Sequence, residues 1–221
     1  MRILMIGAGG VGSSAALIGA RRDFFDHWVV ADYDGARAQA LVDRIADDRF
    51  SAMALDASDP QDVANACREH GITHVLNVVD PRFVVDIFEG AFLAGCDYLD
   101  TAMSLSHKHP DKPYELTGVK LGDDQFAHTD AWAAKGRLAL VGIGVEPGLA
   151  DVFARYAADN LFSEIDELGV RDASNMVVAD YEFAPSFSIW TVIEECLNPP
   201  VVWEKDRGWY TTEPFSDPEV F

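Results

Sequence analysis

Apolar runs and amphipathic segments alternate along the first 100 residues of the chain. Short, largely apolar runs are typical of strands buried on both faces of a parallel sheet. Between them, apolar residues recur every three or four positions, which indicates helices that cover the sheet. We therefore expect strands over residues 3–6, 27–31, 50–55, 74–79 and 97–100, and helices over residues 13–22, 36–46, 60–71 and 82–94.

Turn and cap residues mark the boundaries of these elements. Asp59 and Pro60 suit the N-cap and first helical positions of the third helix, and Asp34 is placed to cap the second. Strand–helix–strand units of this length join parallel strands through right-handed crossovers. The pattern therefore predicts the α/β class, with a doubly wound parallel sheet of the Rossmann type.

The pattern changes after residue 100. Residues 104–123 contain several prolines and glycines and are predicted as a long loop, followed by a helix over 124–135 and a sixth strand over 138–143. We divide the chain into a dinucleotide-binding domain, residues 1–148, and a partial second α/β domain for substrate or dimerisation, residues 149–221. In the second part we expect helices over 149–160 and 188–197, a strand over 165–170, and a hairpin of residues 201–203 and 209–211.

A glycine-rich turn directly follows the first strand. Gly7, Gly9 and Gly12 fit the G-x-G-x-x-G pattern, with Gly10 and Val11 between them. The first glycine allows a tight turn, the second lets the backbone approach a diphosphate, and the third lets helix and strand pack closely. The helix N-terminus adds amide donors and a positive dipole. We therefore expect a dinucleotide site at these five residues; the alternative is a glycine-rich turn without a ligand.

Asp32 ends the second strand, about 20 residues after Gly12, where the dinucleotide fingerprint places a carboxylate for the adenosine ribose hydroxyls. The same carboxylate would repel a 2′-phosphate, so NAD is favoured over NADP. Arg37 lies too far into the next helix to be expected as a phosphate partner. The alternative is that Asp32 only caps the following turn.

Other candidate residues lie where strands are predicted to end, the edge at which open α/β sheets bind ligands. Asp100 and Glu146 are the candidate catalytic acids, because a carboxylate there could hold a substrate ammonium group or act as a base. Each candidate at this edge also has an alternative as a turn residue, a cap or a solvated acid. For the cofactor we expect Asp56 and Ala57 near the adenine, Asn77, Val78 and Val79 near the nicotinamide ribose, and Thr101 after the fifth strand.

Charge and composition narrow the choice of partners. Acidic residues number 37 against 17 basic ones, a formal charge of −20, which disfavours nucleic acid and anionic membranes. No apolar stretch approaches the roughly 20 residues of a membrane span. Three widely spaced cysteines favour reduced thiols and a cytoplasmic location. His107 and His109 have no third ligand at a useful spacing, so we expect no metal.

Together these motifs resemble the saccharopine dehydrogenase-like family, which includes saccharopine reductase and lysine 6-dehydrogenase. The resemblance spans residues 1–200 and rests above all on residues 144–151, which are similar to the family's G-x-[DEA]-P-G segment after strand six. The glycine turn and residues 30–32, 55–60, 77–79 and 98–101 also carry it. Because family members are considerably longer, the chain resembles their N-terminal portion.

This resemblance implies a Rossmann domain with an α/β domain over the nicotinamide, and usually a homodimer. It implies hydride transfer at a C–N bond of an amino acid such as lysine, or of a saccharopine-like imine, with NAD or NADP. Glu146 stands where saccharopine reductases carry an Asp proposed to bind substrate or assist proton transfer.

The sequence offers three candidate functions. The first is a NAD-dependent amino-acid dehydrogenase with a small-molecule substrate. The second is a dinucleotide-binding module without catalysis, such as a sensor or an interaction domain. The third, a reductase of another Rossmann family, is disfavoured because the sequence offers neither a Tyr-x-x-x-Lys pair nor a catalytic cysteine after a strand.

Overall fold

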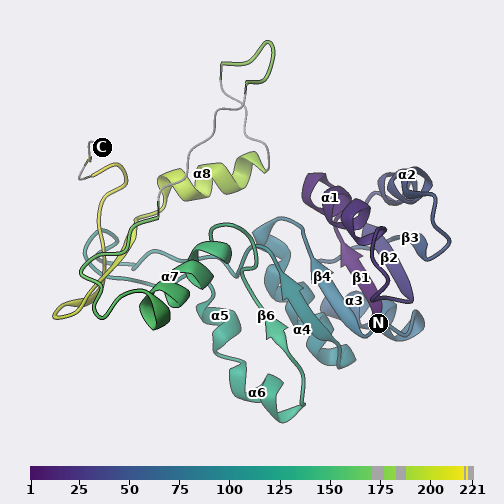
Figure 1. Ribbon diagram of the computed structural model, residues 1–221, viewed down its shortest axis with the longest axis horizontal. Helices are drawn as coiled ribbons and strands as arrows, with labels where there is room; N and C mark the ends of the chain where they lie inside the picture. The colour runs from purple at the N-terminus through teal and green to yellow at the C-terminus, as the bar shows by residue number, and fades with distance from the viewer. Residues whose placement is uncertain (171–176, 183–187, 217, 219–221) are drawn as a thin grey trace.

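The computed structural model describes residues 1–170, 177–182, 188–216 and 218, and its centre is a six-stranded parallel sheet (Figure 1). The strand order is β3-β2-β1-β4-β5-β6. The direction of winding reverses between β1 and β4, as in doubly wound Rossmann folds, so the predicted α/β fold class is confirmed. The strands are β1 (Arg2–Ile6), β2 (His27–Asp32), β3 (Phe50–Ala54), β4 (His74–Asn77), β5 (Asp97–Asp100) and β6 (Ala139–Leu140).

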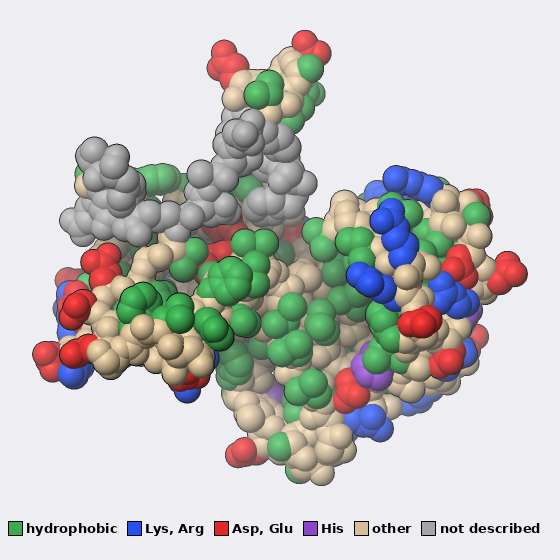
Figure 2. Space-filling view, in the orientation of Figure 1, with side chains coloured by type: hydrophobic (Ala, Val, Ile, Leu, Met, Phe, Trp, Pro, Cys, Tyr) green, Lys and Arg blue, Asp and Glu red, His purple; other side chains and the backbone are tan. Residues whose placement is uncertain are grey.

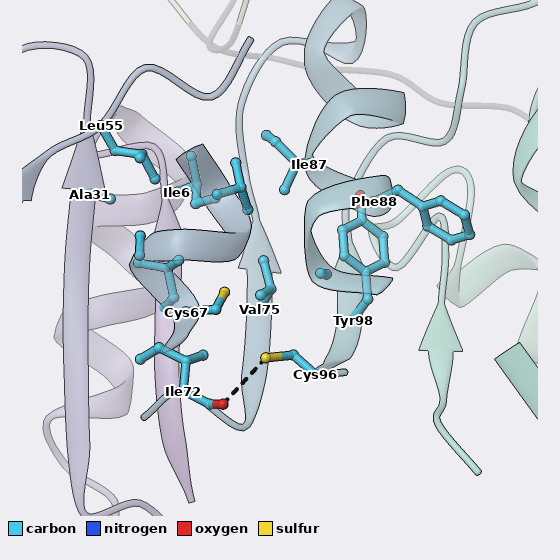
Figure 3. Packing of buried hydrophobic residues seen from close by; sticks show 14 of the residues in the cluster. Ile6, Ala31, Leu55, Cys67, Ile72, Val75, Ile87, Phe88, Cys96 and Tyr98 are labelled. Carbon is cyan, nitrogen blue, oxygen red and sulfur yellow. Dashed lines mark hydrogen bonds between the residues drawn. The ribbon is translucent and has the colours of Figure 1, made fainter. Parts of the chain in front are cut away.

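Helices cover both faces of the sheet because side chains alternate along each strand. On β1, Ile3 and Met5 belong to the apolar layer shared with α1 and α2, whereas Leu4 and Ile6 belong to the layer shared with α3 and α4. Figure 3 shows part of the second layer, where the Tyr98 ring of β5 meets Phe88 of α4. The helices are α1 (Gly10–Gly19), α2 (Gly35–Ile45), α3 (Pro60–Glu69) and α4 (Val84–Ala94), the last preceded by a 3₁₀ turn, η1 (Pro81–Phe83).

The predicted caps of α2 and α3 are confirmed. The Asp34 carboxylate accepts hydrogen bonds from the amides of Ala36 and Arg37, and Asp59 accepts one from Gln61 at 2.8 Å. The first helix, predicted from residue 13, begins instead at Gly10, so the last three residues of the glycine turn belong to the helix.

The sixth strand is shorter than the predicted range of 138–143. It pairs with β5 only at Ala139 and Leu140. Two residues later Gly142 takes a φ of +67°, and its amide donates to the side chain of Asp100 at 2.7 Å. The chain therefore leaves the sheet early and turns toward residues 144–148.

The single helix predicted over residues 124–135 is also wrong, because two short helices, α5 (Asp123–Phe126) and α6 (Thr129–Ala134), replace it. The Thr129 hydroxyl donates to the Phe126 carbonyl at 2.6 Å, and the His128 ring lies 2.9 Å from the Asp124 carbonyl. Both side chains compete for carbonyls that a continuous helix would use, and the helix breaks between them.

The C-terminal part contains the predicted helices and hairpin: α7 (Leu149–Asn160), α8 (Ile189–Leu197), and β7 (Val201–Glu204) paired antiparallel with β8 (Gly208–Thr211). The strand predicted over residues 165–170 is wrong, since no strand in the described part of the chain pairs with this segment. Residues 171–176 and 183–187 of the proposed second domain lie outside the described residues.

The long segment before α5 supports the hairpin. It is irregular apart from a bridge between His107 and Val119. The buried Thr211 hydroxyl of β8 lies within hydrogen-bonding distance of the carbonyls of Pro113 and Leu116, at 3.0 and 3.1 Å. Among the described residues, none of the helices has the length and apolar character needed to cross a membrane.

Candidate functional site

The sheet brings the predicted cofactor residues to one edge. In the parallel register, Ile6 at the end of β1 lies between Ala31 of β2 and Asn77 of β4. The segments that follow these strands therefore leave the sheet side by side, on the edge where doubly wound folds bind ligands.

The glycine turn is packed so tightly at two positions that a side chain cannot enter. A Cβ on Gly12 would lie 1.9 Å from the Gly7 carbonyl oxygen. Gly7 has a φ of +111°, and a Cβ there would lie 2.8 Å from Cγ1 of Val79. These two glycines therefore bring the start of α1 close to the ends of β1 and β4, as the fingerprint requires.

The other two glycines leave open space. Gly9 and Gly10 are exposed, and a Cβ on either would meet no atom of the described residues within 4 Å. Gly9 is the N-cap of α1, and no side chain caps the helix there. The first amides of α1 therefore face an open surface with a positive dipole behind them. Together with the exposed Val11, this arrangement fits a diphosphate.

Asp32 is held at the edge of this turn. It is only 6% exposed, its Oδ2 accepts the Ala8 amide at 2.9 Å, and its Oδ1 accepts the Asp34 amide at 3.0 Å. Because a carboxylate has about four acceptor positions, it retains capacity for a ribose hydroxyl. These contacts also fix the carboxylate beside the glycine turn.

Two residues beside Asp32 were not expected to contribute. Arg37 reaches back along α2, and its guanidinium lies 3.3 Å from Oδ1 of Asp32. It also lies over the ring of Tyr33, 5.3 Å from the centroid, and Tyr33 is 77% exposed. The turn from β2 into α2 brings Arg37 back toward the strand end, so its distance in the sequence was misleading. This pair offers an aromatic and cationic surface next to the ribose position.

The remaining cofactor candidates lie at the same edge. Asp56 is exposed and binds the amide and hydroxyl of Ser58, which lower its pKa. Ala57 is half-buried against the core. Val78 and Val79 border Gly7, whereas Thr101 is half-buried after β5.

The two candidate acids have very different surroundings. Asp100 has no exposed surface and accepts hydrogen bonds from Tyr98, Gln125 and the Gly142 amide. Burial raises the pKa of Asp100, and these hydrogen bonds oppose the increase. Glu146 is exposed on the turn between β6 and α7. Of the two, Glu146 is therefore the acid that a substrate can reach.

The turn that carries Glu146 is compact. The Gly144 amide donates to the Pro147 carbonyl at 2.9 Å, and the Gly148 amide donates to Asp151 at 2.9 Å. Gly148 has a φ of +128°, and a Cβ there would lie 2.5 Å from the backbone of Gly144. The glycines flanking the acid therefore give it a defined position.

A cleft of about 130 Å³ opens beside the β4 end of this edge. Arg82 pairs with Asp80 through two contacts, of 2.8 and 3.1 Å, and Glu194 on α8 contributes a further carboxylate. Trp190, 59% exposed, adds an aromatic face. The cleft thus offers groups of both charges close to the residues that border Gly7. Its lining is Asp80, Pro81, Arg82, Leu105, Trp190, Thr191 and Glu194.

With this geometry established, comparison with known proteins decides the family. The model of the saccharopine dehydrogenase NADP binding domain matches residues 3–140. The chain belongs to the saccharopine dehydrogenase family. The match covers the glycine turn, Asp32 and the ends of β3 to β5, and membership indicates a nicotinamide dinucleotide as cofactor.

Two curated relatives carry the names of carboxylated amines. The chain is 29% identical over 216 residues to carboxyaminopropylagmatine dehydrogenase of Synechocystis sp., covering 97% of this chain and 52% of that protein. It is 30% identical over 217 residues to carboxynorspermidine synthase of Vibrio cholerae, covering 92% of this chain and 50% of that protein. The chain thus spans about half the length of these relatives.

A solved structure supports the fold of this family member. Apo saccharopine dehydrogenase (L-Glu forming) from Saccharomyces cerevisiae matches with a TM-score of 0.53 and 19% identity, over 72% of this chain and 30% of that one. At this identity the likeness concerns the fold alone.

Proposed function

We propose that the whole protein is a NAD-dependent oxidoreductase that transfers a hydride at a C–N bond of a small amine substrate carrying a carboxylate. The observation that carries this proposal is the open amide surface at Gly9 and Gly10, placed beside the buried carboxylate of Asp32. The alternative is a binding module without catalysis, which would share the cofactor site.

NAD is the proposed cofactor because Asp32 lies where the adenosine ribose is expected. Its carboxylate would accept hydrogen bonds from the ribose hydroxyls and would repel a 2′-phosphate. Arg37 supports the competing possibility, NADP, since its guanidinium is 45% exposed and beside the same position. The pairing of Arg37 with Asp32 weakens that case, because the positive charge is already partly neutralised there.

For the substrate, the names of the relatives favour a carboxylated amine over free lysine. Such a molecule has both an anionic group and cationic nitrogens. The cleft beside β4 has matching groups, with Glu194 and Trp190 for a cationic nitrogen. Arg82 is paired with Asp80 through Nε and Nη2, but its side chain is 61% exposed and its remaining donors would bind the carboxylate. We propose that this cleft receives the part of the substrate away from the reacting carbon.

Different residues of the chain would orient the cofactor and transfer the proton. When bound, the nicotinamide would exchange the hydride with the substrate carbon. The glycine turn and Asp32 would orient it. Oxidising an amine to an imine also releases a proton, which Glu146 would accept, and the same carboxyl would return it in the reducing direction. Asp100, enclosed by donors, would not take part in this proton transfer.

The test begins with the wild-type chain and ends with the full-length protein. NADH and NADPH fluorescence titrations on this chain measure binding without chemistry. A screen of carboxylated polyamines, lysine and saccharopine with the full-length protein then measures turnover. NADH binding with turnover of a carboxylated amine is expected. NADH binding without turnover of any amine would favour the non-catalytic module.

We further propose that the protein is a homodimer through α7. Leu149, Val152, Phe153 and Tyr156 lie at the spacing of one helix face, and each is between 46 and 63% exposed. Figure 2 shows apolar side chains gathered over this region of the molecule. Stripes of this kind on soluble proteins are normally covered, and a second copy is the occupant that the family resemblance favours.

A further inference from the structure

Four buried polar side chains and one buried backbone amide form a connected network beneath the ligand-binding edge of the sheet. Asn77 is 1% exposed, Tyr98 is 2% exposed and Asp100 is fully buried. Gln125 of α5 is 4% exposed, and Ser104, whose amide donates to Gln125 at 2.8 Å, is 1% exposed. Polar groups that are buried together in this way are held in place by one another.

Asp100 is the centre of the network. Oδ1 accepts the Gly142 amide at 2.7 Å, and Oδ2 accepts the Tyr98 hydroxyl at 2.9 Å and the Gln125 amide at 2.7 Å. Every partner is a donor, as an ionised carboxylate requires. A buried carboxylate costs free energy that an apolar residue would avoid, even when it is well paired. Its presence is therefore explained better by what it positions than by stability.

One arm of the network leads to the turn that carries Glu146. Gly142 precedes this turn, and its carbonyl lies 2.9 Å from the position of a Cβ on Gly148. The Ile143 amide also donates to the backbone carbonyl of Asp100, at 2.8 Å. The base of the acid-bearing turn is therefore bound to Asp100 by both side chain and backbone.

The other arm leads to the glycine turn. The Asn77 amide group donates to the Tyr98 hydroxyl at 3.0 Å, and Oδ1 of Asn77 accepts the Val79 amide at 3.2 Å. Val79 in turn packs against Gly7, where its Cγ1 excludes any side chain. A continuous path of hydrogen bonds and packing thus joins Asp100 to the proposed dinucleotide site.

We propose that Asp100 is a positioning residue, which holds the Glu146 turn and the glycine turn in one fixed relation through Gly142 on one side and Tyr98 and Asn77 on the other. Because it has no exposed surface, it acts through these groups and does not touch the substrate. Its effect on turnover rests on the proposed function, whereas the coupling of the two loops is a property of the protein without ligand.

The test cuts the arm that leads to the glycine turn and compares the result with the loss of a donor to Asp100 that lies outside both arms. Tyr98→Phe removes the hydroxyl that joins Asp100 to Asn77, and Gln125→Leu removes another donor to the same oxygen without touching the Asn77 arm. Ile87→Val, in the adjacent apolar core, is the control for general destabilisation. For each variant we would measure amide hydrogen exchange at Val79 and Gly142 and the affinity for NADH. Asp100→Asn in the full-length protein adds kcat and KM.

Tyr98→Phe is expected to speed exchange at Val79 at least tenfold and to weaken NADH binding about five- to tenfold, in keeping with the loss of one buried hydrogen bond. Gln125→Leu and Ile87→Val should leave Val79 exchange within about twofold of wild type. Asp100→Asn should speed exchange at both amides and lower kcat more than it raises KM.

Equal exchange at Val79 in Tyr98→Phe and Ile87→Val would overturn the proposal, and this result can be read even if Asp100→Asn fails to fold. A wild-type chain that fails to bind NADH would instead contradict the proposed function. The exchange data would still decide the coupling, so the two failures are distinguishable.

Discussion

Single residues decide which surface a cofactor can reach. Gly7 and Gly12 are enclosed by backbone, so any side chain there would push α1 away from the sheet. Gly9 and Gly10 have the opposite surroundings, with open space in front of the first amides of α1. Asp32 lies beside the glycine turn. Its carboxylate is largely buried and is held in place by the hydrogen bond from the Ala8 amide. The cofactor preference should therefore respond to Asp32 and the arginine paired with it.

Asp32→Ser should reverse the cofactor preference. We expect NADH affinity to fall about tenfold, since charge-assisted hydrogen bonds to the ribose are lost, and NADPH affinity to rise as Arg37 becomes available for a 2′-phosphate. Fluorescence titration with both cofactors measures the change. The matched control is Asp32→Ser with Arg37→Ala, which should lose the gain for NADPH. A wild-type chain that already binds NADPH more tightly than NADH would contradict the role assigned to Asp32.

Glu146→Gln in the full-length protein should lower kcat at least about a hundredfold, the usual contribution of a general acid or base. The NADH dissociation constant should stay within about twofold of the wild-type value, because Glu146 lies on the turn between β6 and α7 and not in the glycine turn. Asp166→Asn, another exposed acid of the C-terminal part, is the control and should leave kcat unchanged. Turnover by Glu146→Gln equal to that of wild type would remove Glu146 from the mechanism.

At the scale of elements, the sequence predicted those helices and strands that apolar periodicity or a local cap determines. The first five strands and α1 to α4 follow from apolar periodicity, and the caps at Asp34 and Asp59 were readable because capping is a local interaction. The early end of β6 was not readable in this way, because Asp100, whose side chain accepts the Gly142 amide, lies 42 positions away. The helix break at His128 has a local cause, since the His128 and Thr129 side chains contact carbonyls three or four residues earlier. Apolar periodicity does not report such contacts between side chain and backbone, so the break was missed.

The same distinction applies to the candidate site. The glycine turn and Asp32 form a motif with fixed spacing, so both could be found in the sequence. The burial of Asp100 and the cleft between η1 and α8 arise from tertiary packing. The contact of Arg37 with Asp32 follows from the geometry of the turn between β2 and α2, which residue spacing alone does not give. A lone acid at a strand end has the same appearance in a sequence whether it is buried or exposed.

The hairpin of β7 and β8 should depend on the irregular segment before α5. Thr211→Val removes the hydroxyl that is within hydrogen-bonding distance of the Pro113 and Leu116 carbonyls. The free energy of opening the hairpin should fall by about 1 kcal/mol or more. Limited proteolysis and amide exchange over β7 and β8 should both accelerate, with no change in β1. The neighbouring Thr212→Val is the matched control. Equal protection of the hairpin in the two variants would show that the segment does not hold it.

At the scale of the whole molecule, an acidic chain binds an anionic cofactor. The formal charge of −20 repels a dinucleotide at long range, so the α1 N-terminus must supply the local attraction. The chain also spans about half the length of its curated relatives and exposes the apolar stripe of α7. The proposed cofactor site lies at the start of α1 and the proposed dimer surface lies on α7. Variants of the two elements can therefore test the two proposals independently.

The proposed dimer should dissociate when the α7 stripe is charged. Phe153→Glu places a carboxylate at a position that is 63% exposed, so the fold should tolerate it while association is lost. Light scattering coupled to size exclusion measures the mass, with a dimer expected for wild type and a monomer for the variant. Glu164→Gln serves as a surface control. A monomeric wild-type protein at full length would contradict the homodimer.

The most direct test of the central claim is NADH binding to the wild-type chain and to Gly9→Leu. The backbone of Gly9, with φ −76° and ψ −160°, accepts any residue, and the space before it is open, so the thermal midpoint should not change. Ala40→Leu on exposed α2 adds a similar side chain away from the site. We predict saturable NADH binding by wild type and Ala40→Leu, and a loss of at least about a hundredfold in Gly9→Leu, because the leucine side chain would fill the place of the diphosphate. Undiminished affinity in Gly9→Leu, or no binding by wild type, would contradict the account.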